Sequence, residues 1–181
     1  YDLWYEITGH FLLTTPMLAS RPVPGLPSKR GWERGYDDTL ILPAGNMRRM
    51  FLDACDCPGV PNIRGGKWEV RWDTQFLDPG LIKPFFNPVP PDHPGGQGKG
   101  LTEIESISPG TRVPFTAVIP GSHCSPRSFV MLLVAAGRWC GLSPSCHKQG
   151  WGRFQVEVDP QQIEHWTDWL QAHAETAPEA E

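Results

Sequence analysis

The chain has 181 residues, a formal net charge of −4 and 39% hydrophobic residues. This length predicts one domain with its own core, and the acidic balance excludes a globally basic protein, so a nucleic-acid partner would need a local basic patch. No apolar run reaches about 18 residues, which excludes a membrane-spanning helix, and the opening YDLWYEITG is neither a signal nor a transit peptide, so we expect a cytoplasmic protein.

Two segments of different character open the chain. Aromatic and β-branched residues at 3–13 predict a strand, in which Gly9 indicates a bulge or a close backbone approach. Residues 14–38 contain four prolines and three glycines, so we expect a long loop there. This loop carries a cluster of basic side chains: Arg21, Lys29, Arg30 and Arg34.

A short strand and a helix follow. The strand is predicted at 39–42, and Pro43 then stands where the first turn of a helix tolerates proline. Residues 46–54 are helix formers, and their apolar members share one face: Met47, Met50, Phe51 and Ala54. The sequence Cys-Pro-Gly at 57–59 ends this helix.

The middle of the chain predicts strands and a second long loop. Residues 67–76, KWEVRWDTQF, alternate strictly between apolar and charged side chains and predict one half-buried strand. Residues 78–100 are rich in proline and glycine and predict a loop or an arm. Strands at 102–107 and 112–119 follow as a hairpin joined by Ser108, Pro109 and Gly110, and Pro114 makes the second strand an edge strand or an irregular one.

Two helices and a strand are expected in the last third. Residues 125–140 predict an apolar helix buried on most sides, with Ser125 as N-cap and Gly141 as C-cap. The last strand ends at residue 158, and residues 159–174 form a terminal helix. One stripe of this helix is apolar, with Ile163, Trp166, Trp169 and Leu170, and residues 175–181 form an acidic tail.

The order of these elements predicts the fold class. Strand, helix, two strands, helix and strand is the ferredoxin-like, or RRM-like, arrangement of an α+β protein. We therefore expect residues 1–158 to form one antiparallel sheet with two packing helices. The segments 14–38 and 78–100 would be long Pro/Gly-rich loops, and the terminal helix would be added outside this domain.

The chain contains five cysteines: Cys55, Cys57, Cys124, Cys140 and Cys146. An odd count indicates free thiols. A metal site could combine Cys55, Cys57, Cys124 and Cys146 with the neighbouring His123 and His147, but the spacing differs from the paired CxxC of common zinc sites. We expect reduced structural cysteines, no metal and no cofactor.

Several stretches resemble the RAMP superfamily, which supplies backbone and capping subunits and crRNA-processing enzymes of CRISPR effector complexes. EITGHFLLTTPM is similar to the first strand of that family and DDTLILPAGNMRRMFLDA to its first helix. ESISPGTRVPFTAVI and GLSPSCHKQGWGRFQVEV are similar to its hairpin and to its glycine-rich loop before the last strand. The chain departs from the pattern at Ala44, Gly45 and Asn46, where the family has Gly-Ser-Ser, and at Arg49, where it has glycine. The resemblance implies guide-RNA binding within a ribonucleoprotein complex.

The glycine-rich loop is the first candidate RNA-binding site. Gly150 and Gly152 allow positive φ and could leave N–H donors free for phosphate, and Lys148 and Arg153 supply positive charge. Trp151 offers a face on which a base could stack. The alternative is a tight turn in which the glycines only pack against the sheet and Trp151 belongs to the core.

Two further candidate RNA-binding sites are basic. One is the helix start with Asn46, Arg48 and Arg49, where a helix N-terminus favours phosphate and where the resemblance gives Arg48 a contact to the RNA backbone. The other is the loop cluster with Lys29, Arg30 and Arg34. The alternative for both is a solvated surface.

Catalysis is the less favoured interpretation. His147 and His10 are weak candidates for a general acid or base, and we expect no nuclease activity. The sequence thus predicts a non-catalytic RNA-binding subunit whose partners are guide RNA, other subunits or copies of itself, and no membrane. Alternatives are a metal-independent crRNA-processing endoribonuclease, or a phage-borne protein-interaction module that mimics or caps such a complex.

Overall fold

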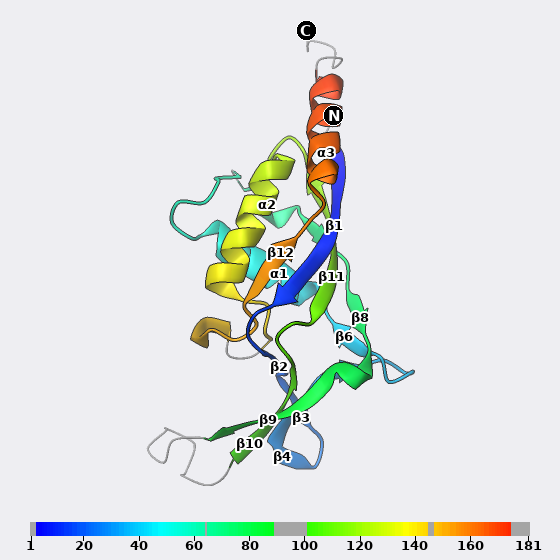
Figure 1. The fold of residues 1–181 in the computed structure, drawn as a ribbon, viewed down its shortest axis with the longest axis vertical. Coiled ribbons are helices and arrows are strands. Elements are labelled where there is room, and N and C mark those ends of the chain that lie inside the picture. Colours follow the sequence, from blue (N-terminus) through cyan, green and yellow to red (C-terminus); the bar gives the residue numbers. More distant parts are fainter. Residues whose placement is uncertain (1–2, 64, 89–100, 145–146, 175–181) are drawn as a thin grey trace.

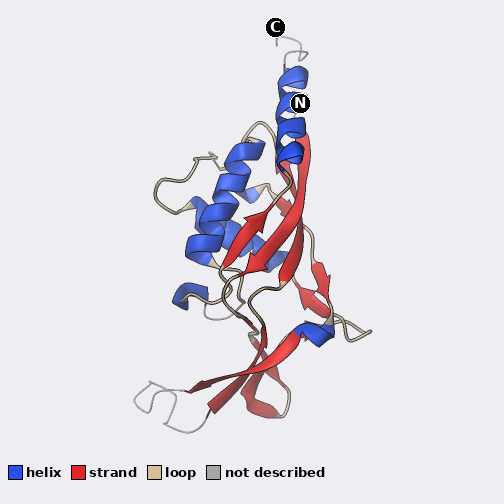
Figure 2. Cartoon of the chain, in the orientation of Figure 1, coloured by secondary structure: helices blue, strands red, loops and turns tan. Residues whose placement is uncertain are grey.

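The computed structural model describes residues 3–63, 65–88, 101–144 and 147–174. These residues form a mixed α+β structure with three sheets and three α-helices (Figures 1 and 2). Every strand pair is antiparallel except that of β4 with β10. The prediction of an α+β protein is confirmed. None of the helices in the described ranges has the length and apolar character that crossing a bilayer requires.

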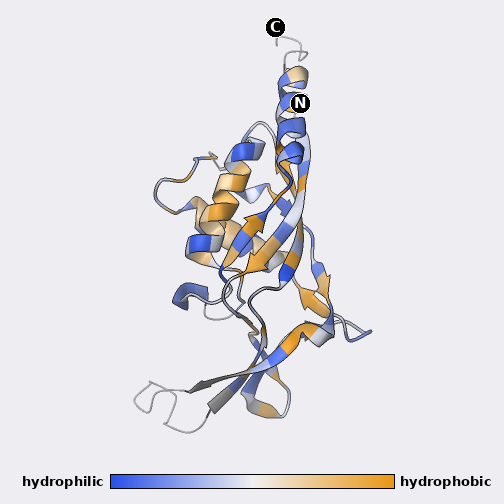
Figure 3. Ribbon diagram, in the orientation of Figure 1, coloured by the Kyte–Doolittle hydropathy of each residue, from blue (hydrophilic) through white to orange (hydrophobic). Residues whose placement is uncertain are grey.

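The central sheet contains four strands in the order β12-β1-β11-β7. The strands are β1 (Trp4–Leu13), β7 (Arg71–Trp72), β11 (Arg112–Pro120) and β12 (Phe154–Glu157). One face of β1 is buried through Tyr5, Ile7, Phe11 and Leu13. Two helices, α1 (Ala44–Cys55) and α2 (Pro126–Ala135), lie on one side of this sheet (Figure 1). Figure 3 shows apolar residues along α2 and the sheet, while α3 is mostly hydrophilic.

The aromatic core joins the two helices to the sheet. The ring of Phe51 on α1 lies 5.4 Å from that of Phe129 on α2, and both contact Trp72 of β7. The apolar face predicted for α1 is confirmed, because its four members are fully buried. The close approach predicted at Gly9 is also confirmed, because a Cβ there would overlap the carbonyl oxygen of Glu157.

The capping signals of the second helix are confirmed. The Oγ of Ser125 accepts a hydrogen bond from the Ser128 N–H at 3.2 Å, and Pro126 opens α2. The helix continues as a π-helical turn, η3 (Ala136–Cys140), and Gly141 ends it at φ 76°. The prediction that this helix is buried on most sides is wrong, since Met131, Val134 and Trp139 are each more than half exposed.

The predicted loop at 14–38 is instead a set of strands. It contains β2 (Met17–Leu18), β3 (Arg21–Val23), β4 (Leu26–Gly31) and β5 (Glu33–Arg34). The second sheet has the order β2-β10-β4-β3, and β9 (Ile82–Pro88) also pairs with β10 (Leu101–Ile107). The prolines misled the prediction because β3 is an edge strand, where proline is tolerated. The part of the second predicted loop at 89–100 lies outside the described residues.

The predicted hairpin at 102–119 is also wrong. Strand β10 belongs to the second sheet, whereas β11 belongs to the central sheet, so the two strands do not pair. The turn itself exists, with Gly110 at φ 85° and its N–H donating to the carbonyl of Leu13 at 2.8 Å. The turn therefore carries the chain from one sheet to another.

The alternating stretch at 67–76 is not one strand. It begins with a 3₁₀ turn, η1 (Gly66–Trp68), and then contributes β7 to the central sheet and the start of β8 (Gln75–Leu77) to a third sheet, order β5-β6-β8. β6 (Leu40–Leu42) confirms the predicted short strand. Trp68, in the 3₁₀ turn, is 58% exposed, and Phe76, in β8 after the chain has changed sheets, is 64% exposed.

The terminal helix α3 (Pro160–Ala174) packs against β1 through its N-terminal half. The ring of Trp166 lies 6.2 Å from that of Tyr5, and the Gln162 side chain accepts from the Thr8 N–H at 2.8 Å. Trp166 and Leu170 pack on the core but remain half-buried. The predicted acidic tail at 175–181 lies outside the described residues.

Candidate nucleic-acid interface

The glycine-rich loop uses its backbone donors inside the protein. The Gly152 N–H donates to the carbonyl of Pro16 at 2.8 Å, and the Arg153 N–H donates to Thr15 Oγ1 at 2.9 Å. The Gly150 N–H donates to the carbonyl of His147 at 3.1 Å. These three N–H groups are not free for phosphate, and the prediction that the two glycines supply free donors is wrong.

Only one of the two glycines is required by packing. Gly152 has φ 76°, and a Cβ there would overlap the backbone nitrogen of Ser143. Gly150 has φ 97° but faces open space. Trp151 lies in the turn before β12 rather than in the strand, and its half-buried ring packs on the core. The tight-turn alternative is confirmed for Gly152, whereas Gly150 has no packing contact of this kind and Trp151 is only half-buried.

The cations of this loop differ in exposure. One terminal nitrogen of the Arg153 guanidinium donates to the carbonyl of Arg138, so this side chain is held against the π-helical turn η3. Lys148 is exposed in a short 3₁₀ turn, η4 (His147–Gln149). Burial lowers the pKa of the neighbouring His147, and the positive charge of Arg49 adds to this effect. Of the predicted cations in this loop, Lys148 alone is presented to solvent.

Arg49 joins α1 to the segment that follows α2. One terminal nitrogen of its guanidinium donates to the carbonyls of Gly141 and Ser143 at 3.1 and 3.4 Å, and the other pairs with Asp53 at 3.2 Å. Burial lowers the pKa of Arg49, and the charge of Asp53 opposes this shift. Arg49 therefore has a structural role at the position where sequence analysis placed an RNA contact.

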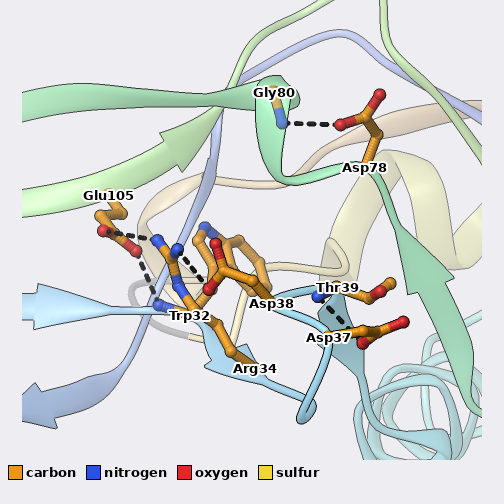
Figure 4. Close-up of polar contacts among 8 residues, drawn as sticks. All are labelled: Trp32, Arg34, Asp37, Asp38, Thr39, Asp78, Gly80 and Glu105. Atoms are coloured by element: carbon orange, nitrogen blue, oxygen red, sulfur yellow. Dashed lines mark hydrogen bonds and ion pairs between the residues drawn. The ribbon is translucent and has the colours of Figure 1, made fainter.

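The basic cluster of the 14–38 segment is matched by acids. Lys29 lies 3.5 Å from Glu103, and Arg34 lies 3.1 Å from both Asp38 and Glu105. Figure 4 shows that Glu105 also accepts from the backbone N–H of Trp32, at 3.0 Å. A nearby turn is closed separately by Asp37, which accepts from the Thr39 N–H (Figure 4).

These contacts change the expected role of the cluster. The hydrogen bond to Asp38 is the main cause of the raised pKa of Arg34. Arg30 donates to the carbonyl of Lys29 at 3.1 Å. The cluster thus holds β4 and β5 to β10, and its charge is largely compensated.

Arg48 lies elsewhere, in a cavity of about 620 Å³ that the sequence did not predict. We name it the Trp–Arg pocket, defined by Trp4, Arg48, Trp68, Arg71 and the start of α1 at Ala44 and Gly45. The guanidinium carbon of Arg48 lies 5.8 Å from the ring centre of Trp68, and that of Arg71 lies 4.9 Å from the ring centre of Trp4. Each arginine therefore stands over an indole face.

The Trp–Arg pocket combines uncompensated positive charge with aromatic surface. Arg48 and Arg71 are exposed, and neither guanidinium has a hydrogen bond or an ion pair with another described residue. The lining acid, Glu69, lies 4.0 Å from His123. The Ala44 N–H already donates to Thr74 Oγ1, so the attraction for anions rests on the arginines. Arginine with an indole face is a chemistry that binds single-stranded nucleic acid.

Sequence analysis assigned only Arg48 of this pocket to RNA. Trp68 and Arg71 were placed on opposite faces of one predicted strand, and Trp4 in the first strand had no assigned role. The signal that could have found them is Gly65-Gly66 directly before Lys67-Trp68, because paired glycines break a strand. The 3₁₀ turn that results turns Trp68 outward over α1.

The candidate catalytic histidines lie apart from this pocket. His10 is exposed on the outer face of the central sheet, in register with Glu157, which pairs with Arg112 at 2.9 Å. His147 is half-buried beside α1, and its Nδ1 has no hydrogen-bond partner among the described residues. Neither histidine lines the Trp–Arg pocket.

The cysteines form no metal cluster within the described ranges. No group of three or more His, Cys, Asp or Glu residues there could hold a metal ion, and Cys146 lies outside those ranges. The described cysteines are free thiols: Cys55, Cys57, Cys124 and Cys140. Burial raises the pKa of Cys124 to about 12, so this thiol is protonated at neutral pH.

No protein-family model matches the chain, and no curated protein sequence is significantly similar to it. Function is therefore argued from the geometry of the Trp–Arg pocket.

Proposed function

We propose that the chain is a non-catalytic RNA-binding subunit of a CRISPR-type ribonucleoprotein complex, related to the RAMP superfamily. The observation that carries the proposal is the Trp–Arg pocket, where two unpaired arginines each stand over a tryptophan. Single-stranded RNA is recognised by stacking of bases on aromatic rings and by cations at the phosphates. The pocket offers both within one cavity.

The central sheet supports a ferredoxin-like fold for this subunit. Its strands and helices follow one another as β1, α1, β7, β11, α2 and β12. The first and third strands, β1 and β11, pair in the middle of the sheet, as the split βαβ arrangement requires. The second and third sheets are then additions to this core.

We place the proposed contact with guide RNA in the Trp–Arg pocket rather than in the glycine-rich loop. Arg48 is the residue to which the resemblance gave a contact with the RNA backbone, and it remains unpaired. Arg49 and Arg153 are held by backbone carbonyls. We therefore assign the RNA contact to Arg48 and Arg71, with Trp4 and Trp68 as stacking surfaces.

An apolar surface on α2 favours a protein partner as well. Met131 and Val134 lie one helical turn apart and are 57% and 53% exposed, with Trp139 nearby at 61%. Exposed apolar residues that gather on one helix are typical of interaction sites. This surface supports assembly with other subunits, and it also favours the second candidate function, a protein-interaction module without RNA.

Titration of a labelled single-stranded RNA, followed by fluorescence anisotropy at low salt, tests the proposal. We expect Arg48→Ala and Arg71→Ala each to weaken binding about tenfold, because a charged contact contributes about 1.5 kcal/mol. Arg138→Ala is the matched control, since Arg138 also stands over an exposed tryptophan, 5.3 Å from the ring centre of Trp139, and lies outside the pocket. The Arg138→Ala variant should bind RNA with the affinity of the wild type.

Three other results of this titration would contradict the proposal in different ways. An equal loss in all three variants would mean nonspecific attraction and would contradict the pocket as the site. Shortened RNA would favour the endoribonuclease, and replacement of His147 or His10 would identify the responsible residue. No binding at low salt would remove the RNA proposal and leave the protein-interaction module.

A further inference from the structure

Two thiols meet where α1 and the π-helical turn η3 end. The Sγ atoms of Cys57 and Cys140 lie 3.9 Å apart, and either thiol can donate a hydrogen bond to the other. Cys57 follows the end of α1 by two residues, and Cys140 is the last residue of η3. The two cysteines stand 83 residues apart in the sequence, so the tertiary fold alone brings them together.

The two sulfur atoms are already close to bonding distance. An S–S bond measures about 2.05 Å, so the atoms need to approach by about 1.9 Å to form one. Cys57 has the freedom for this movement because it lies in a bend outside α1, next to the exposed Pro58 and Gly59. The sulfur of Cys57 can therefore approach that of Cys140 while the helix stays in place.

The two thiols differ in exposure, which sets the order in which they react. Cys57 is half-buried beside the exposed Asp56, whereas Cys140 is only 8% exposed. Burial and the neighbouring Cys57 raise the pKa of Cys140, so its sulfur stays a protonated thiol at neutral pH. A small oxidant from solvent therefore meets Cys57 first, and Cys140 is placed to react with the product.

We propose that Cys57 and Cys140 form a reversible disulfide when the protein meets hydrogen peroxide, and that this bond fastens the end of α1 to η3. First, the Cys57 sulfur attacks one peroxide oxygen and the O–O bond breaks. Cys57 becomes a sulfenic acid, and the other oxygen leaves as water with the thiol proton. Next, the Cys140 sulfur attacks the Cys57 sulfur, the S–O bond breaks, and the hydroxyl leaves as water with the Cys140 proton. The two thiols thus lose two electrons and two protons, and the peroxide is reduced to two waters.

The disulfide crosses a junction that Arg49 holds by hydrogen bonds. Arg49 donates from α1 to the carbonyls of Gly141 and Ser143, which follow Cys140 in the chain. A covalent bond between positions 83 residues apart restricts the unfolded chain, so it stabilises the fold at this junction. The inference is independent of the proposed RNA binding, since neither cysteine lines the Trp–Arg pocket.

Mass spectrometry of the full chain after treatment with hydrogen peroxide tests the proposal. The remaining thiols are alkylated, and the protein is digested with trypsin without reductant. Trypsin leaves Cys55 and Cys57 in one peptide and Cys140 and Cys146 in another. We expect these two peptides to be joined, to be lighter by two hydrogen atoms than their sum, and to separate after addition of dithiothreitol.

Serine variants identify which sulfur atoms are joined. The link between the two peptides should be lost in Cys57→Ser and Cys140→Ser and retained in Cys55→Ser and Cys146→Ser. Cys55→Ser is the matched control, because Cys55 stands two residues from Cys57 and is also half-buried. The circular dichroism spectrum of Cys57→Ser should equal that of the wild type, which shows that loss of the link does not come from misfolding.

Thermal unfolding is the second readout. The oxidised wild type should melt at least about 5 °C above the same sample after dithiothreitol, which reduces the disulfide and leaves oxidised methionines unchanged. Cys57→Ser should show no such difference. Free thiols throughout the treated wild type, a link retained in Cys57→Ser or Cys140→Ser, or a covalent dimer in place of the internal link would overturn the proposal. A linked protein that melts no higher than the reduced one would overturn the stabilising role of the bond.

Discussion

Gly150 and Gly152 stand two residues apart and face different constraints. Both have positive φ, 97° and 76° respectively, which costs a residue with a Cβ about 1–2 kcal/mol. Only Gly152 also meets the backbone of Ser143, whereas a Cβ at Gly150 would have no atom of the described residues within 4 Å apart from its chain neighbours. The loop therefore requires glycine for packing at one position and for dihedral freedom alone at the other.

This difference predicts unequal effects of alanine at the two positions. We expect Gly152→Ala to lower the free energy of unfolding by at least about 3 kcal/mol and Gly150→Ala by about 1 kcal/mol. Urea denaturation followed by circular dichroism measures both. Equal losses would mean that the contact between residue 152 and Ser143 is relieved by a small shift of the loop.

At the scale of elements, Arg49 connects α1 with the segment after α2. Its guanidinium satisfies the carbonyls of Gly141 and Ser143, and the preceding residue, Arg48, points into the Trp–Arg pocket. Consecutive arginines on one helix thus serve different purposes. One stabilises the packing of the elements, and the other is available to a ligand.

Replacing each of the two arginines by alanine should therefore change the free energy of unfolding by different amounts. We expect Arg49→Ala to lower the free energy of unfolding by about 2 kcal/mol, because hydrogen bonds from a charged donor to buried carbonyls are lost. Arg48→Ala should change it by less than about 0.5 kcal/mol, as for most exposed positions. Thermal unfolding of both variants with the wild type checks this. A larger loss in Arg48→Ala would contradict the assigned roles.

The elements that the sequence predicted correctly are those with local signals. Helix α1 begins after Pro43, α2 begins after Ser125, and its π-helical continuation η3 ends at Gly141, because capping signals lie within a few residues of a helix end. The prediction of one strand at 67–76 was wrong because alternation indicates only that a strand has one buried and one exposed face. It carries no information on which strand pairs with it, and here two different sheets supply the partners.

The same limit explains the candidate site. Arg48 could be predicted from its place at the helix start, whereas the role of Trp68 and Arg71 depends on the turn at Gly66–Trp68, for which the glycine pair before Lys67 is the one local signal. The roles of Arg34 and Arg153 also needed tertiary partners, Glu105 and the carbonyl of Arg138. A basic residue in the sequence gives no sign of whether the fold will neutralise it.

At the scale of the whole molecule, the net charge of −4 does not oppose local binding of an anion. Many of the basic side chains form ion pairs that hold elements together. Lys29, Lys67 and Arg112 are examples. Beyond about 10 Å, salt at physiological strength screens the remaining acidic field. The unpaired arginines of the Trp–Arg pocket therefore act at short range.

This distribution predicts how salt affects RNA binding. For single strands the logarithm of the binding constant falls with the logarithm of salt concentration by about 0.7 per neutralised phosphate. If Arg48 and Arg71 each neutralise one phosphate, each alanine variant should reduce that slope by about 0.7, while Arg138→Ala should leave it unchanged. Anisotropy titrations over a series of salt concentrations measure the slopes. A lower affinity with an unchanged slope would show that the arginines act by stacking on the tryptophans and bases, and would contradict the phosphate contacts.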